Sequence, residues 1–228
     1  MSKITSLTLD FLNELKKNNN RDWFEKNKSR YQKSHLEVAA FAEKLIEVMN
    51  QFDQIETPSG KKSLFRIYRD VRFSKNKDPY KVNRSGSFKR AGEDRRGGFY
   101  FSIEPGNTII GGGFYQPNSD DLNLIRKQIE MDAEPLRTVL KQKKFKSYYK
   151  KLLGDQLKTA PRGFEKDDPN IDLLRYKSFY VMHSFSDEEV LSEDFVEKVA
   201  EGYKNLLPFF EVMSTYLTTD LNGASTLH

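Results

Sequence analysis

Residues 99–115 read FYFSIEPGNTIIGGGFY, in which two apolar, aromatic-rich runs flank a Glu-Pro-Gly-Asn turn. Proline at the second position of a four-residue turn and glycine at the third favour a type II turn, because glycine readily takes the positive φ that this turn needs. Apolar runs on both sides of such a turn are typical of an antiparallel β-hairpin. The sequence therefore predicts a hairpin over residues 99–115.

Two further strands are predicted, one on each side of this hairpin. Residues 64–73 read LFRIYRDVRF, where apolar and polar side chains alternate as they do on a half-buried strand. Residues 176–185 read YKSFYVMHSF and contain a second strand-like run. Between the first of these strands and the hairpin, residues 74–98 are polar and show no periodicity.

Helical periodicity marks both ends of the chain. Apolar side chains recur at helical spacing over 9–15 and 23–52, which predicts a short helix followed by a long one. Helices are also predicted between the hairpin and residue 176, and again over 195–216, with a bend or break at Pro208. Helices, then strands, then helices are typical of an α+β fold. We expect a central, mostly antiparallel sheet packed against amino-terminal and carboxy-terminal helices.

The composition predicts a folded chain with an aromatic core. Aromatic residues make up 13% of the 228 residues, whereas disordered chains are poor in them. No repeat or low-complexity linker marks a domain boundary. We expect residues 1–220 to form a single α+β domain and residues 221–228 to be a disordered tail.

The residue types that are missing exclude several classes of chemistry. The chain has no cysteine, which excludes disulfides, thiolate metal sites and cysteine nucleophiles. No run approaches 18 apolar residues, and the first residues lack the apolar segment of a signal peptide. We therefore expect a cytoplasmic protein that does not act at a membrane.

Positive charge is concentrated in one segment. The whole chain carries a net charge of +5, but residues 61–96 contain 13 Lys and Arg against four acids, a net +9. Residues 165–220 contain 13 acids against five bases, a net −8. Such segregation points to an anionic partner, or to the two segments pairing with each other.

The basic segment predicts an anion-binding pocket built by residues 66–81, RIYRDVRFSKNKDPYK. Arginine offers forked donors and lysine a mobile point charge, which together suit phosphate or carboxylate. The predicted ligand is therefore a small phosphorylated or carboxylated molecule. The candidate ligand-binding residues are Arg66, Tyr68, Arg72, Lys75, Lys77, Tyr80, Lys81 and Gly112. Gly112 belongs to a glycine run that either forms the floor of this pocket or lets its strand pass close under a helix.

Other interpretations of the same segment stay open. Aromatic residues interleave with the cations of residues 61–96, as expected of a nucleic-acid-binding protein. The acidic and basic faces could also form a protein-interaction module. Within the segment, we predict a structural ion pair between Arg69 and Asp70, and we expect Asp70 to orient an arginine rather than to act as a base.

No metal site or cofactor is predicted. The three histidines are scattered, and neither GxGxxG nor GxxxxGK[ST] is present. His35 falls on the apolar side of the long helix, so we expect a core or interface histidine whose hydrogen bonds are satisfied. No catalytic residue is identified, and the sequence leaves open whether the protein is an enzyme.

Four fragments of the chain together resemble one protein family. They are FLNELKKNNNRDWFEKNKSRY, FRIYRDVRFSKNKDPYK, GGGFYQP and LKTAPRGFEKDDPNIDLLRYKSF. This combination resembles the DUF2461 family of bacterial proteins. The resemblance implies a single bacterial cytosolic domain and implies no particular chemistry.

Overall fold

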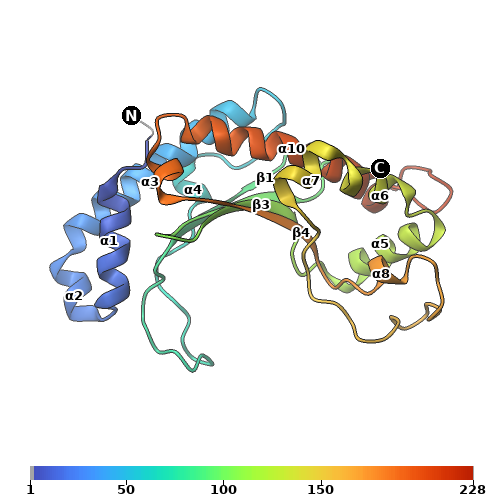
Figure 1. The fold of residues 1–228 in the computed structure, drawn as a ribbon, viewed down its shortest axis with the longest axis horizontal. Helices are drawn as coiled ribbons and strands as arrows, with labels where there is room; N and C mark the ends of the chain where they lie inside the picture. Colours follow the sequence, from blue (N-terminus) through green and yellow to red (C-terminus); the bar gives the residue numbers. More distant parts are fainter. Residues whose placement is uncertain (1–2, 228) are drawn as a thin grey trace. The chain divides into compact units, whose positions relative to one another are not determined.

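A four-stranded antiparallel sheet runs through the structure, with its strands in the order β1-β2-β3-β4 (Figure 1). The structure is a computed structural model that describes residues 3–227, so the last residue of the predicted tail lies outside the described residues. The strands are β1 (Arg84–Lys89), β2 (Gly98–Ile103), β3 (Thr108–Phe114) and β4 (Phe179–Phe185). The predicted α+β class is confirmed.

Helices precede the sheet, interrupt it between β3 and β4, and follow it. The first group is α1 (Ser6–Lys17), α2 (Arg21–Lys26), α3 (Lys28–Met49) and α4 (Gly60–Ser63). The second is α5 (Ser119–Met131), α6 (Glu134–Lys141), α7 (Lys143–Tyr149) and α8 (Ile171–Leu174), and the last is α9 (Asp187–Leu191) and α10 (Phe195–Thr218). Within the described residues, no helix has the length and apolar content needed to span a membrane.

The chain divides into two compact units. Unit 1 comprises residues up to 89, 99–110 and 184–201, and unit 2 comprises residues 90–98, 111–183 and those from 202 onward. This division does not test the expected single domain, which stays a prediction.

The predicted hairpin is confirmed. It is formed by β2 and β3, and the amide of Asn107 donates to the carbonyl of Glu104 across the turn at 2.9 Å. Gly106 takes the positive φ, 72°, that the third position of a type II turn requires.

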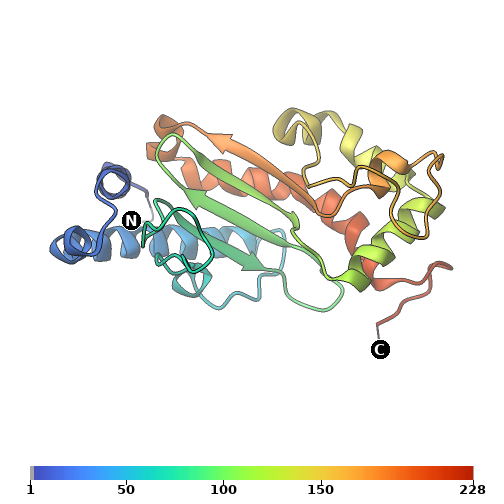
Figure 2. The ribbon, with the colours of Figure 1, turned by 90° about the horizontal axis from the view of Figure 1, so that it is seen from below.

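The core of unit 1 is built from phenylalanine rings. Phe41 of α3 stacks on Phe195 of α10 at 5.2 Å and meets Phe101 of β2 edge-on at 5.9 Å. Phe88 of β1 stacks on Phe101 at 5.5 Å. These contacts hold α3 against one face of the sheet, where Figure 2 shows it running behind the strands. The expected aromatic core is confirmed.

A second apolar cluster in unit 1 holds the segment that follows α4. Ile67 and Tyr80 are buried against Phe24 and the apolar face of α1. The Tyr80 ring stacks on Phe24 with centroids 3.9 Å apart, and Tyr80 is only 4% exposed. The side chain of Asn19 bonds both the amide and the carbonyl of Tyr80, at 3.1 and 2.9 Å.

The strand predicted over residues 64–73 is wrong. Isolated bridges join Leu64 to Gly86 and Tyr68 to Tyr80, and beyond them the backbone forms an irregular loop. We call residues 64–81 the basic arm. Its alternating apolar residues do not form a strand, because the side chain at the far end, Phe73, is 96% exposed instead of being buried in the core. Arg66 and Arg72 therefore do not lie on one face of a strand.

Two other predictions also need correction. Strand β1 lies in the polar stretch where no element was predicted, because Arg84, Ser85 and Gly86 are all buried and the strand shows no apolar–polar alternation. The long helix predicted over 23–52 is two helices, α2 and α3, separated at Asn27, whose φ and ψ of −107° and 16° are not helical.

Unit 2 places α10 directly on β3. A Cβ atom on Gly112 would lie 3.0 Å from the Phe210 ring and 3.1 Å from Leu206 of that helix. The glycine therefore lets the strand pass close under the helix, which was one of its two predicted roles. Beyond α10, the amide of Thr226 donates to the carbonyl of Thr218 at 2.8 Å, so the described part of the predicted tail folds back in a turn. Disorder of this tail stays a prediction.

The buried Tyr80 ring gives a test of how the basic arm is held. Tyr80→Ala should lower the free energy of unfolding by about 3–5 kcal/mol, the range for deleting a buried ring. Tyr68→Ala, on the same arm but 52% exposed, should cost about 1 kcal/mol. Urea unfolding of both variants measures the difference, and equal losses would contradict the anchoring role of Tyr80.

Candidate anion-binding site

The first residue of β1 is an arginine whose side chain is buried. Arg84 is 1% exposed, and its Nη2 donates to Nδ1 of His35 at 2.8 Å. Its guanidinium carbon lies 5.5 Å from the centre of the Tyr31 ring. Its Nε is buried and has no hydrogen-bond partner in residues 3–227.

The residues that surround Arg84 come from α3. Tyr31 and His35 are one helical turn apart, and their rings stack with centroids at 5.8 Å. The Tyr31 ring also contacts Phe24, at 5.1 Å. Phe24 belongs to the apolar cluster that holds the basic arm, and Tyr31 packs against that cluster. This packing fixes the position of Tyr31 beside Arg84.

The bond between His35 and Arg84 determines the state of the imidazole. A guanidinium only donates hydrogen bonds, so Nδ1 of His35 accepts and the proton of the neutral ring lies on Nε2. Burial lowers the pKa of His35, and the positive charges of Arg84 and Lys61 lower it further. His35 was expected to be a core or interface histidine with satisfied hydrogen bonds; it is half-buried, and its Nδ1 is bonded whereas its Nε2 bonds no other residue in the described part of the chain.

More cations lie around this pair. Burial lowers the pKa of Lys81, as do the positive charges of Arg66 and Arg84. Burial also lowers the pKa of Arg84 itself, although an arginine side chain stays protonated in proteins. We call the set the Arg84 cluster: His35, Lys61, Arg66, Lys81 and Arg84.

The cluster lacks the carboxylates that usually accompany buried cations. In the described part of the chain, Lys61, Arg66, Lys81 and Arg84 form no ion pair. Arg66 contributes to the lowered pKa of Asp70, but the carboxylate of Asp70 is bound by Arg72 at 2.7 Å. A buried charge without a partner is costly, so the cluster suits an anion supplied from outside.

The four cations of the Arg84 cluster differ in how exposed they are. Lys61 and Arg66 are exposed, Lys81 is half-buried and Arg84 is buried. Lys81 lies between the two extremes and is close enough to both Arg66 and Arg84 for their charges to lower its pKa.

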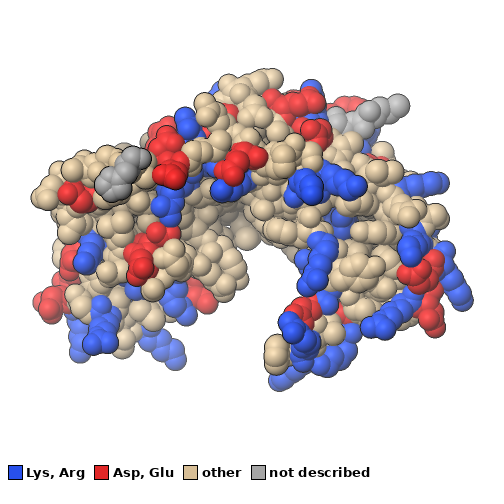
Figure 3. Space-filling view, turned by 180° about the vertical axis from the view of Figure 1, so that it is seen from behind, with Lys and Arg blue, Asp and Glu red and all other residues tan. Residues whose placement is uncertain are grey.

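The other predicted ligand residues lie elsewhere. Tyr80 is a core residue, and Gly112 belongs to unit 2, where α10 covers it. The tip of the basic arm carries Arg72, Lys75 and Lys77. Figure 3 shows Lys and Arg side chains gathered there, at the lower right. Lys77 is tied back to the arm, since its Nζ donates to the carbonyl of Val71 at 3.0 Å. Tyr68 is exposed on the arm itself.

The predicted pair of Arg69 and Asp70 is wrong. Nη1 of Arg69 donates to the carbonyl of Asp78 at 3.1 Å, across the arm. Asp70 instead accepts from the amide of Arg72 at 3.2 Å and from its guanidinium, because the backbone turns at this point rather than running as a strand. These hydrogen bonds to Arg72 are the main cause of the lowered pKa of Asp70. Asp70 therefore orients an arginine, as predicted.

Sequence reasoning missed Lys61, Arg84 and the role of α3. Arg84 lies in a stretch, RSGSFK, in which neither alternation nor an apolar run marks a buried strand. The available signal was the helical spacing of Tyr31 and His35, which places two ring systems on one face of α3.

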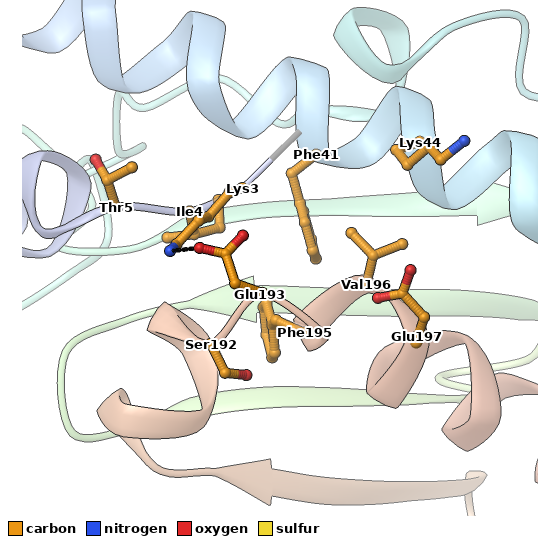
Figure 4. A pocket seen from close by; sticks show the side chains of 10 residues that line it. All are labelled: Lys3, Ile4, Thr5, Phe41, Lys44, Ser192, Glu193, Phe195, Val196 and Glu197. Atoms are coloured by element: carbon orange, nitrogen blue, oxygen red, sulfur yellow. Dashed lines mark hydrogen bonds and ion pairs between the residues drawn. The ribbon is translucent and has the colours of Figure 1, made fainter. Parts of the chain in front are cut away.

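A cavity of about 400 Å³ lies elsewhere in unit 1 (Figure 4). Phe41, Phe195 and Val196 contribute apolar surface to it, and Lys3 bonds Glu193 beside them. Its lining carries charges of both signs and so does not select an anion. In the described residues, no group of three His, Asp or Glu side chains is placed to hold a metal ion.

Comparison with known proteins places the chain in a family. A family model described as a conserved hypothetical protein, DUF2461, matches residues 7–211. The match includes every residue of the Arg84 cluster. No curated protein matches the sequence.

The hydrogen bond from Arg84 predicts how His35 titrates. Protonated His35 could not accept this bond, and burial and the nearby cations also disfavour its charge, so the midpoint should lie below 6.5. Because the pKa is lower in the folded state, the associated stability is full above pH 6.5 and is lost as the pH falls through the folded-state pKa. NMR titration of the imidazole proton signals, assigned with His35→Gln, measures the midpoint. A midpoint at or above 6.5 would contradict the arrangement.

Proposed function

We propose that this chain, which belongs to the DUF2461 family, binds a small phosphorylated or carboxylated ligand at the Arg84 cluster. The observation that carries the proposal is the burial of the Arg84 guanidinium with no carboxylate partner in residues 3–227. Unpaired buried charges are rare unless a metal, a ligand or a reaction requires them. No residue is assigned a catalytic role in this proposal.

The neighbouring cations support an anionic ligand rather than a structural role for Arg84 alone. Arg66 and Arg84 are close enough to Lys81 to disfavour its positive charge. An arriving anion removes this mutual repulsion and accepts charge-assisted hydrogen bonds from the same groups.

The family resemblance supports the remaining part of the proposal, a bacterial protein that acts in the cytoplasm.

Nucleic acid is a second candidate ligand, favoured by the exposed rings of the basic arm. Phe65, Tyr68 and Phe73 are 42%, 52% and 96% exposed, and Arg72 lies 5.8 Å from the centre of the Phe73 ring. Exposed rings among cations are what single-stranded nucleic acid uses for stacking and backbone contact.

The anion proposal is tested by comparing two lysines of the same arm. Lys81→Met should weaken binding of inorganic phosphate or succinate about tenfold or more, because a charge-assisted hydrogen bond contributes about 1.5–3 kcal/mol. Lys75→Met, at the tip of the arm, should leave the affinity unchanged. Isothermal titration calorimetry at fixed salt measures both.

Arg84→Met should weaken binding at least as much as Lys81→Met. Failure of the parent protein to bind any of these anions would refute the proposal, as would equal effects of Lys75→Met and Lys81→Met. Urea unfolding of each variant confirms that the protein remains folded.

The second candidate is tested by the salt dependence of oligonucleotide binding. A single strand held through about six phosphates should give a log–log slope near −4, and a triple change of Phe65, Tyr68 and Phe73 to Ala should abolish binding. A flat response to salt, or no binding at all, would exclude this candidate.

A further inference from the structure

We propose that the ligand of the Arg84 cluster is a phosphomonoester that carries a planar ring, the chemistry of a nucleoside monophosphate. The inference rests on the proposed anion-binding function and narrows its ligand class. The observations that carry it are the unbonded donors of Arg84 and the position of the Phe65 ring beside Lys81.

The charges of the cluster fit a dianion better than a carboxylate. Lys61, Arg66, Lys81 and Arg84 are positive, and none of them is paired with an acid in the described residues. A carboxylate supplies a single negative charge, whereas a phosphomonoester supplies close to two near neutral pH.

The hydrogen-bonding capacity of Arg84 supports the same class. Its Nη2 bonds His35, while its Nε and Nη1 bond no other residue in the described part of the chain. The three terminal oxygens of a phosphate can accept from this guanidinium and from the Lys81 ammonium together.

Phe65 supplies a surface for a ring next to this phosphate position. Nζ of Lys81 lies 5.5 Å from the centre of the Phe65 ring. The Phe65 ring also contacts Tyr100 at 6.5 Å, yet 42% of the residue stays exposed. The Lys81 ammonium lies over this ring, so a phosphate bound to it would be next to the exposed part of the Phe65 surface.

A base stacked on Phe65 would add affinity that a phosphate alone does not have, because every base presents a π-face to an aromatic side chain. Two sources share this chemistry: a free mononucleotide, and the 5′-terminal nucleotide of a single strand. Phe73, farther along the arm, would contact further bases only in the second case.

The test compares adenosine 5′-monophosphate, glycerol 3-phosphate and inorganic phosphate by isothermal titration calorimetry at fixed salt. The parent protein should bind the nucleotide about tenfold more tightly than glycerol 3-phosphate. Phe65→Leu, which keeps an apolar side chain but removes the ring, should abolish this preference and leave the affinity for glycerol 3-phosphate unchanged. Arg84→Met should weaken all three ligands, and Lys75→Met should weaken none.

Equal affinities for the nucleotide and glycerol 3-phosphate would overturn the inference while leaving the proposed anion site intact, as would an unchanged preference in Phe65→Leu. Absence of binding by all three phosphates would overturn both. Tighter binding of a 5′-phosphorylated oligonucleotide than of its 5′-hydroxyl form and of the mononucleotide identifies a strand end as the source. Tighter binding of the mononucleotide than of the 5′-phosphorylated oligonucleotide identifies the free nucleotide, and either result supports the inference. A 5′-hydroxyl oligonucleotide that binds as tightly as the 5′-phosphorylated form and the mononucleotide would overturn it.

Discussion

Unit 1 buries a positive charge that its own described residues do not neutralise. The Arg84 guanidinium lies under the Tyr31 ring and bonds the neutral imidazole of His35, and neither group supplies a negative charge. Burying a cation in this way costs stability, which the apolar packing around it must offset. The aromatic contacts of α3 with α2 and the sheet, including those of Tyr31 and Phe41, provide that packing.

The basic arm depends on the same packing. Its stem is fixed by Ile67 and Tyr80, which are buried against Phe24 and α1. The amide of Phe65 then bonds the carbonyl of Ser85 at 2.9 Å, which ties the arm to β1 immediately beside Arg84. Arg66 and Lys81 therefore lie on the part of the arm whose backbone is bonded to β1 and to Ile67.

The parts of the fold with strong local signals could be predicted from the sequence. Glu-Pro-Gly-Asn specified the turn between β2 and β3, and Ser186 and Glu189, which have the sequence spacing of a capping box, form one at the start of α9. Asn20, the last of three consecutive asparagines, caps α2. In each case a few neighbouring residues determine the backbone, so the structure follows from the sequence alone.

The candidate site could be predicted only in part, because it depends on contacts between distant residues. The charge density of residues 61–96 indicated the correct region and included Arg66 and Lys81. Residues 64–73 alternate as a strand does, but in residues 3–227 no strand pairs with the far end of this segment. Arg84 could not be selected from the many basic residues, since its burial arises from α3, about fifty residues earlier in the chain.

The most direct measurement is a crystal structure of the protein grown with phosphate or adenosine 5′-monophosphate. A phosphate oxygen should lie within hydrogen-bond distance of Nε of Arg84, with the Lys81 ammonium on the same phosphate. Phosphate density found only at the tip of the basic arm, with no anion at the Arg84 guanidinium, would contradict the assignment of this site.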